Sequence, residues 1–274
     1  MDSLPLIFIE STFERADLST CCSATALGER RWSDAASRTD QRIRETPMFV
    51  VLIATDGSDV LFKARSAESS LDFAAFAAIK ATIPDIRMMC VSHAMYRNYE
   101  WESGAGFTDG PKVSRQEFEK RCAPVIASRL QRQTTLILED SGFAHQVLLD
   151  KLSCRTDFFH LRLYFNGETS AQFVEKQLEA NKDLSVLQLS GEWPQRFVGL
   201  LRDFQPTAFF NLNAVDSSLR FDFDFVKRFV ENGGNRRLCV RVNFKQDQMA
   251  KITAISTARA TWNDQLVTVF ERKT

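Results

Sequence analysis

The segments DFFHLRLYF (157–165) and LSVLQLS (184–190) carry the clearest fold signal in this chain, because apolar and polar residues alternate in each. Such alternation over a short β-type run predicts a strand with one face buried and the other in water. Four more runs of β-type residues share the same half of the chain: TTLILED (134–140), TAFFNLN (207–213), RRLCVRVNF (236–244) and QLVTVFE (265–271). We therefore expect repeated short strands between residues 134 and 271.

A segment with helical character precedes each run. These segments are residues 114–132, 143–153, 169–182, 194–204, 222–232 and 246–258. The runs begin 23 to 29 residues apart, so each unit contains one helix and one strand. A period of this length is typical of leucine-rich-repeat solenoids. The prediction is an α/β fold built as an irregular leucine-rich-repeat-like solenoid, with its strands parallel and in chain order.

A doubly wound α/β sheet also alternates helices and strands, so it is the competing architecture. Its strands are covered by helices on both faces and are nearly all apolar, whereas the strands of a solenoid keep one face in water. Here a polar residue lies between two apolar neighbours in four of the runs, at Arg162, Gln188, Asn211 and Arg241. Burying these four without partners would cost several kcal/mol each. The pattern favours the solenoid.

The same four polar residues are the predicted partner-binding site. If the strands pair in register, Arg162, Gln188, Asn211 and Arg241 form one row across the sheet, with a step of about 4.8 Å. Such a row offers directional hydrogen bonds and charge-assisted contacts to a protein partner. A sheet face that merely contacts solvent is the alternative interpretation of the row.

The first 113 residues are organised differently, and we divide the chain into residues 1–46, 47–113 and 114–274. Residues 1–46 form a small helical module, with helices expected over about 2–16 and 23–44. Two β-type runs around Thr55-Asp56-Gly57-Ser58 then predict a β-hairpin over 48–65. A buried helix from Ser69 or Ser70 to Thr82, a strand over 86–92 and a long loop over 93–113 complete the middle part.

Charge and cysteine content narrow the classes of partner and the compartment. Thirty-five basic residues balance thirty-five acidic ones, so the sequence has no electrostatic signature of a nucleic-acid or membrane partner. The six cysteines are scattered without metal or disulfide spacing. Together with an N-terminus that lacks a secretion signal, this predicts a reduced, cytoplasmic or nuclear protein.

The residue types needed for catalysis are sparse and dispersed. The three histidines, His93, His145 and His160, have no metal-ligand spacing and no nucleophile motif near them. Asp222 and Asp224 begin a predicted helix, where carboxylates stabilise the positive end of the helix dipole. We expect no enzyme activity, no metal and no cofactor.

The N-terminal module resembles an F-box, the short helical module that recruits proteins to the adaptor subunit of cullin-based ubiquitin ligases. Leu4-Pro5 matches its opening Leu-Pro, and Trp32 matches its late Trp. With the irregular units that follow, such as Leu187-Gln-Leu-Ser-Gly-Glu-Trp193-Pro194, the chain is similar to the F-box-associated families expanded in nematodes. The resemblance assigns adaptor binding to Leu4, Pro5, Phe8, Ile9, Leu27 and Trp32.

Two functional hypotheses follow from these observations. In the first, the protein is a substrate-recruiting adaptor: residues 1–46 bind the ligase, and the polar strand face binds a target protein. In the second, the protein is a plain interaction solenoid without a ligase link, and its N-terminal helices only cap the core. An exposed apolar patch formed by Leu4, Pro5, Phe8 and Ile9 would favour the first hypothesis.

Overall fold

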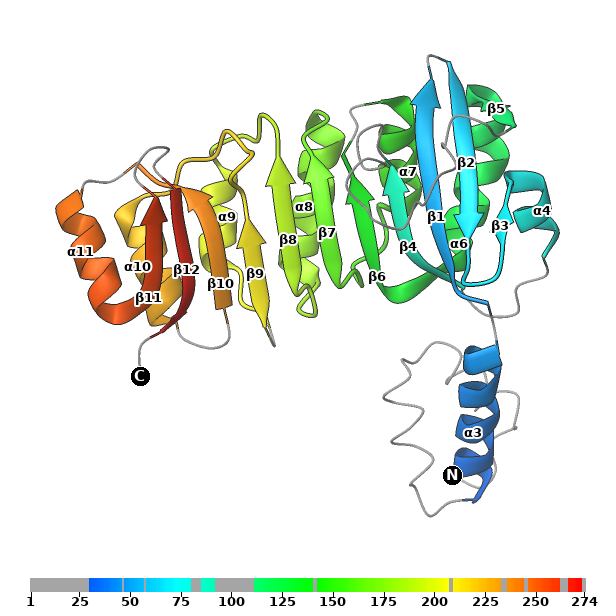
Figure 1. The fold of residues 1–274 in the computed structure, drawn as a ribbon, viewed down its shortest axis with the longest axis horizontal. Helices are drawn as coiled ribbons and strands as arrows, with labels where there is room; N and C mark the ends of the chain where they lie inside the picture. The colour runs from blue at the N-terminus through cyan, green and yellow to red at the C-terminus, as the bar shows by residue number, and fades with distance from the viewer. Residues whose placement is uncertain are drawn as a thin grey trace.

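The computed structural model describes residues 30–45, 47–56, 58–79, 85–91, 111–139, 142–206, 209–232, 236–243, 246–261 and 266–272. In these residues twelve strands join in one sheet, and helices lie along it (Figure 1). The protein is a mixed α/β structure, as the sequence predicts.

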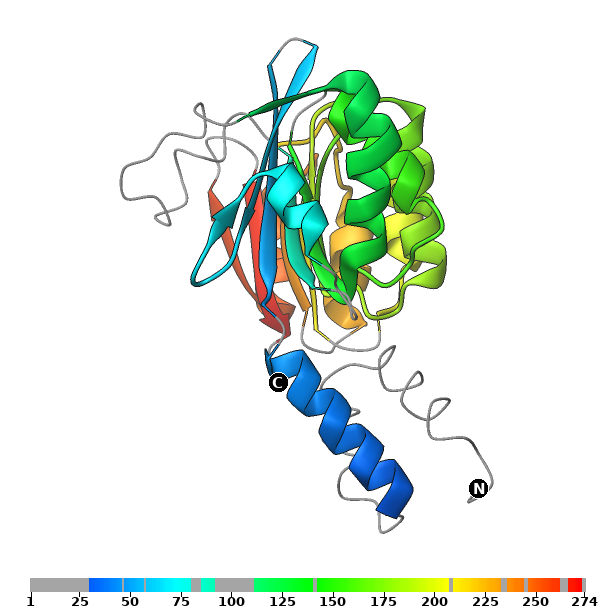
Figure 2. The same cartoon turned by 90° about the vertical axis from the view of Figure 1, so that its right-hand side faces the viewer.

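Helix α3 (Arg30–Glu45) is the first described element, and it lies below the sheet in Figure 1, beyond the ends of the strands rather than on either face of the sheet (Figures 1 and 2). It corresponds to the second helix expected from the sequence. The helix expected over residues 2–16 lies outside the described residues.

The predicted hairpin is confirmed. Strands β1 (Phe49–Asp56) and β2 (Asp59–Arg65) pair antiparallel from Val50 with Arg65 to Asp56 with Asp59. The Asp-Gly pair therefore predicted the position of the turn between the two strands correctly.

The helix expected to begin at Ser69 or Ser70 starts later and is shorter. Ser70–Leu71 pairs with β2 as the short strand β3, so the chain is still extended at these residues. Asp72 then caps α4 (Phe73–Ala78), because its Oδ1 accepts a hydrogen bond of 2.8 Å from the backbone N–H of Ala75. Pairing with a neighbouring strand thus displaced the start of the helix.

Strand β4 (Ile86–Val91) confirms the strand expected over 86–92. It pairs parallel with β1 on one side and with β6 on the other, so the sheet runs without interruption from the hairpin into the later units. Most of the expected loop lies outside the described residues, but its end forms β5 (Lys112–Ser114), which pairs with β2.

The second half of the chain alternates helices and strands as expected. Its helices are α5 (Arg115–Glu117), the π-helix η2 (Phe118–Cys122), α6 (Ala123–Arg129), α7 (Phe143–Leu152), α8 (Glu168–Ala180), α9 (Phe197–Asp203), α10 (Phe223–Glu231) and α11 (Gln246–Ile255). Its strands are β6 (Leu130–Leu138), β7 (His160–Tyr164), β8 (Val186–Ser190), β9 (Phe210–Asn213), β10 (Arg236–Arg241), β11 (Ser256–Thr261) and β12 (Leu266–Arg272).

The order of strands in space follows the chain over most of the sheet. From β4 through β6, β7, β8, β9 and β10, each strand lies parallel to the next one. The helices that accompany these strands lie on one side of the sheet (Figure 2). We call this helical side the covered face and the opposite side the open face.

The prediction of parallel strands in chain order is wrong at the C-terminal end. Strand β12 pairs antiparallel with β10, and β11, which the sequence did not predict, pairs antiparallel with β12 at the edge. The last helix, α11, leads directly into β11 without a connecting loop. The final part of the chain is therefore a hairpin that adds to the sheet in reverse order.

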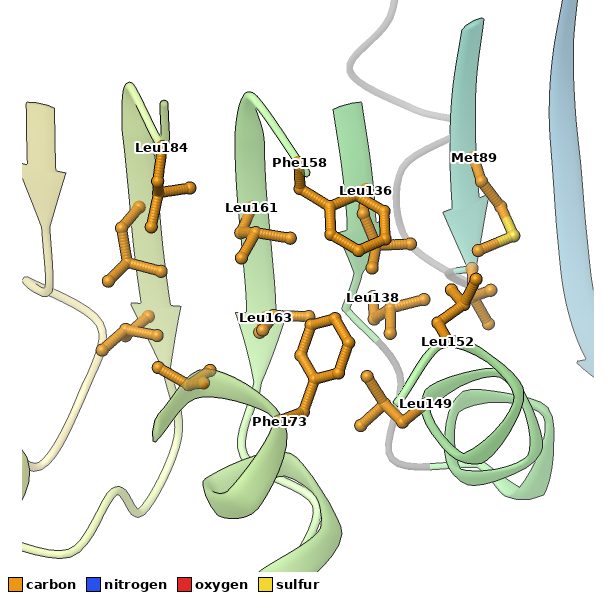
Figure 3. Packing of buried hydrophobic residues seen from close by; sticks show 14 of the residues in the cluster. Met89, Leu136, Leu138, Leu149, Leu152, Phe158, Leu161, Leu163, Phe173 and Leu184 are labelled. Carbon is orange, nitrogen blue, oxygen red and sulfur yellow. The ribbon is translucent and has the colours of Figure 1, made fainter. Parts of the chain in front are cut away.

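The covered face is built from apolar side chains that align across neighbouring strands. Leu136, Leu161, Leu187, Leu212 and Leu238 are successive register partners, and all five are fully buried. Side chains from the helices, such as Leu149 and Phe173, close over this layer (Figure 3). Burying each such side chain contributes roughly 1.5–3 kcal/mol, so this layer is the main source of stability.

Buried amides join one unit to the next at the ends of the helices. In α8, the Nε2 of Gln177 donates to the carbonyl of Arg155 at 2.6 Å. The Nδ2 of Asn181 donates to the carbonyl of Phe158 at 2.7 Å. Both amide side chains are almost fully buried, so they satisfy backbone carbonyls of the preceding connection that water does not reach.

A buried ion pair connects the hairpin part of the sheet to the units that follow. Arg129, the last residue of α6, pairs with Asp85 through both carboxylate oxygens. Its Nη1 donates to the carbonyl of Phe76 at 2.7 Å, and its guanidinium lies over the Phe76 ring, 3.7 Å from the centroid. Arg129 therefore holds α4, the start of β4 and the end of α6 together.

Candidate functional site

The open face carries the side chains that alternate with the buried leucines. Between β7 and β10 these side chains are polar more often than apolar, and most are half-buried. They are His160, Arg162, Tyr164, Val186, Gln188, Ser190, Asn211, Asn213, Arg237, Cys239 and Arg241. None of them is acidic, so this part of the open face combines amide and hydroxyl groups with positive charge.

The structure confirms only two of the four residues in the predicted polar row. Arg162 and Gln188 are direct register partners on β7 and β8, as expected. The next residues in this row are Asn213 and Cys239, rather than Asn211 and Arg241. Asn211 lies two residues earlier on β9, and Arg241 lies two residues later on β10. All of these side chains share the open face, but the observed row is Arg162, Gln188, Asn213 and Cys239.

The shift has a physical cause in the apolar residues. Leu187 pairs with Leu212, which places Ala214 at the end of β9 where β8 has Leu189. Ala214 is fully buried and fills this apolar position although it is small. Aligning β9 by its large side chains therefore put Asn211, two residues too early, in the row. On β10 the apolar pattern fits Cys239 and Arg241 equally, because each lies between two large apolar residues, and choosing the more polar residue put the row two residues too late. The pattern Leu212-Asn213-Ala214 was the signal that was missed.

Arg162 forms an ion pair on the open face with Glu139, which follows the end of β6. The side chain of Arg162 is 34% exposed and that of Glu139 is 15% exposed. The pair therefore lies at the surface, where it leaves part of the guanidinium accessible. Glu139 is the second-to-last residue of the predicted strand run TTLILED (134–140), but the sequence gave no reason to pair it with Arg162.

Arg241 lies at the C-terminal end of β10 and has a different environment. Its Nε is buried without a hydrogen-bond partner. Within the described residues no ion pair or other side-chain hydrogen bond is made by Arg241. The residue as a whole is half-buried, so the remainder of the guanidinium is partly accessible from the open face. Its positive charge is therefore not compensated by any of the residues that the structure describes.

His160 begins β7 on the open face and is a neutral group at pH 7. Burial, and then the positive charge of Arg162, lower the pKa of His160 below its ordinary value of 6.5. Its Nε2 is buried without a hydrogen-bond partner. The imidazole has no nucleophile or carboxylate partner that would make it a general base among the residues that the structure describes.

The geometry offers little for catalysis in the part of the chain that the structure describes. No group of three or more His, Cys, Asp or Glu side chains that could hold a metal ion occurs among these residues. Burial raises the pKa of the Cys122 thiol to about 12, so it stays protonated and unreactive at neutral pH. Asp222 caps α10, as expected, with its Oδ1 accepting a bond of 2.7 Å from the Phe225 N–H.

The residues assigned to adaptor binding fall mostly outside the described chain. Leu4, Pro5, Phe8, Ile9 and Leu27 lie outside the described residues. Trp32 lies in the first turns of α3 and is half-buried. Two neighbours on the same helix, Ala35 and Ala36, are fully buried.

None of the described helices is both long and apolar enough to cross a membrane. Comparison with known proteins found no matching family model, no matching curated protein and no matching solved structure.

Proposed function

We propose that this protein is a non-enzymatic, protein-binding adaptor whose open sheet face holds a target protein. The observation that carries the proposal is the contrast between the two faces of one sheet. Helices cover one face, while the other presents Arg162, Gln188 and Asn213 in register on three adjacent strands. A regular array of amides and a guanidinium, spaced by the strand distance, suits hydrogen bonding to a protein surface.

The finer architecture that we propose is an irregular leucine-rich-repeat-like solenoid over residues 114–274. Parallel strands in chain order from β6 to β10, with helices on one side, support it. A contact just after β7 supports it too: Nδ2 of Asn166 donates a hydrogen bond of 3.5 Å to the carbonyl of Gly142, which belongs to the preceding unit. Links between neighbouring units are what a stack of repeats requires.

For the N-terminal module we propose binding to the adaptor subunit of a cullin-based ubiquitin ligase. The resemblance to an F-box through Leu4, Pro5 and Trp32 supports this assignment. The position of α3 beyond the ends of the strands supports it as well, because a ligase subunit bound there would leave the open face accessible to a target. The protein would then join a target to the ligase, in a cytoplasmic or nuclear setting.

A direct binding measurement tests the ligase link. The full chain is titrated with the purified F-box-binding adaptor subunit in a calorimeter, together with a Leu4→Ala/Pro5→Ala variant. We expect micromolar or tighter binding that the variant loses. An Arg162→Ala/Arg241→Ala variant is the matched control, and it should bind the subunit like the wild type because its changes lie on the sheet. Absence of binding at high micromolar concentration would favour the plain interaction protein with an N-terminal cap.

A cross-linking comparison tests the open face itself. A photo-crosslinking residue is placed at Gln188 on the open face, or at Arg228 on the exposed side of α10, and the protein is irradiated in cells that express it. We expect a protein adduct from position 188 that position 228 does not give. Equal labelling from both positions would contradict the assignment of the open face as the target site.

A further inference from the structure

Arg241 is the residue of the open face that is best placed to bind an anionic group of a ligand. Its Nε is buried and unpartnered, and its side chain has no counter-charge among the described residues. A half-buried guanidinium without a partner is destabilising, because desolvation is not offset by a hydrogen bond or an opposite charge. A positive group kept in this state is available for an anionic group that arrives from outside.

The remaining charges on this part of the face show where such an anion would bind. Glu139 already neutralises Arg162 at the β6–β7 side. No acidic residue alternates onto the open face from β7 to β10. Among the described residues, the positive charge on this face that lacks a partner is therefore that of Arg241 on β10. Between the two ends lie the uncharged amides of Gln188 and Asn213.

We propose that the open face binds an extended acidic peptide segment of the target, with a carboxylate of that segment paired to Arg241. The amides of Gln188 and Asn213 then donate and accept hydrogen bonds along the same segment. Arginine suits this role because its planar group binds a carboxylate through two parallel hydrogen bonds. This inference rests on the proposed function, since it specifies the chemistry of the target that the open face holds.

The face matches a peptide better than a nucleic acid. Binding a phosphate backbone requires several unpaired cations along a track, because affinity comes from neutralising many phosphates. Here the central row is uncharged apart from the paired Arg162, and the whole chain has net charge zero. A single carboxylate near Arg241, flanked by groups that hydrogen-bond to amides, matches the distribution of charge on this face.

The first test measures peptide binding by the full chain with matched charge variants. The probe is a fluorescein-labelled ten-residue peptide of alternating Glu and Ser, compared with one of alternating Lys and Ser. We expect binding of the Glu peptide only, weakened by salt, and weakened roughly tenfold or more by Arg241→Gln. Arg228→Gln removes the same charge from the exposed side of α10 and should leave the affinity unchanged.

Several results would overturn the inference. These are no binding of the Glu peptide, equal losses in Arg241→Gln and Arg228→Gln, or equally tight binding of a ten-nucleotide single strand. The charge-reversed variant Arg241→Glu adds a positive check, because it should bind the Lys peptide and reject the Glu peptide. A reversal of selectivity by a variant whose circular-dichroism spectrum and melting match the wild type cannot result from misfolding, so this variant keeps the test decisive if Arg241→Gln is destabilised.

Alkylation of two of the protein's cysteines is a second, independent measurement of where the peptide binds. Cys239 lies in the same row as Asn213 on the open face, whereas the exposed Cys154 follows α7 away from that face. Alkylation with iodoacetamide, mapped by peptide mass spectrometry, should slow at Cys239 when the Glu peptide is present and stay constant at Cys154. Equal rates at Cys239 with and without peptide would place the peptide elsewhere and contradict the inference.

These experiments separate failure of the inference from failure of the proposed function. If a target cross-links from Gln188 but the Glu peptide neither binds nor protects Cys239, the open face is a protein-binding site of different chemistry. If neither position 188 nor Cys239 reports a ligand, the proposed function fails together with the inference.

Discussion

Arg129 and Arg162 each pair with a carboxylate, but on opposite sides of the sheet and in very different surroundings. Arg129 is nearly buried, holds Asp85 through two bonds and also contacts the carbonyl and ring of Phe76. Arg162 is about one-third exposed, and among the described residues its side chain is bonded to Glu139 alone. The same chemical pair therefore occurs in two settings: burial makes Arg129 a structural connection, and exposure leaves part of Arg162 accessible to solvent.

The two faces of the sheet differ in the same way. On the covered face, a side chain is surrounded by others, and its loss leaves a cavity or an unpaired group. On the open face from β7 to β10, most side chains are half-buried or exposed, so the loss of one should change stability little.

Replacing Arg129 with Ala should have the largest effect on stability. It leaves Asp85 buried without its counter-charge and frees the Phe76 carbonyl, which costs about 3–5 kcal/mol of unfolding free energy. Urea denaturation followed by circular dichroism measures the change. The double variant Asp85→Leu/Arg129→Met removes both charges, and it should recover most of the loss. A single variant as stable as the wild type would show that the pair does not connect the two parts of the sheet.

Two adjacent residues on β8 compare the faces directly. Leu187→Ala removes a fully buried side chain from the covered face and should cost about 2–5 kcal/mol. Gln188→Ala, one residue later on the open face, should stay within about 0.5 kcal/mol of the wild type. Thermal and urea unfolding of both variants give the comparison. Similar costs at the two positions would mean that the open face is covered in solution.

Replacing Arg162 with Ala should cost about 1–2 kcal/mol, less than Arg129→Ala, because solvent reaches one-third of the Arg162 side chain and partly screens the pair, whereas Glu139 is only 15% exposed. Glu139→Gln should cost a similar small amount. Both are measured by urea unfolding. A loss as large as that of Arg129→Ala would contradict the distinction between a connecting pair and a surface pair.

The smallest expected effect is the pH dependence contributed by His160. Its pKa is lowered in the folded protein by burial and by Arg162, so the unfolded chain takes up a proton at a higher pH than the folded one. Stability from this group is therefore complete above about pH 6.5 and is lost as the pH falls below that value. His160→Gln should lose less stability between pH 7 and pH 5 than the wild type does. An unchanged pH profile would show that His160 titrates normally.

The sequence predicted the arrangement of elements well because periodicity is local. The alternation in Leu161-Arg162-Leu163 and Leu187-Gln188-Leu189 assigned strand faces correctly, and the hairpin and β4 were placed within a few residues. Contacts between distant segments could not be read in this way. Asp85 and Arg129 are 44 residues apart, and nothing in either neighbourhood identifies the other.

Register and strand order at the C-terminal end were the main errors. Ala214 occupies a position where other strands have a large side chain, which concealed the true alignment of β9. On β10, Cys239 and Arg241 both lie between large apolar residues, so the apolar pattern alone did not fix the register. Strand β11 follows α11 without turn residues, so the segment Ser256–Thr261 gave no signal of a separate strand. A strand that returns antiparallel depends on pairing partners rather than on its own composition.

The hairpin of β1 and β2 and the antiparallel pair of β11 and β12 lie at opposite ends of the same parallel stack. Neither pair repeats the helix-and-strand unit, so a further unit added at either terminus would find no matching edge. Growth of this protein by duplication is therefore confined to the interior, between β6 and β10. Each inserted unit would widen the open face by one strand spacing, about 4.8 Å, without altering either end. The width of the open face is thus set by the number of internal units.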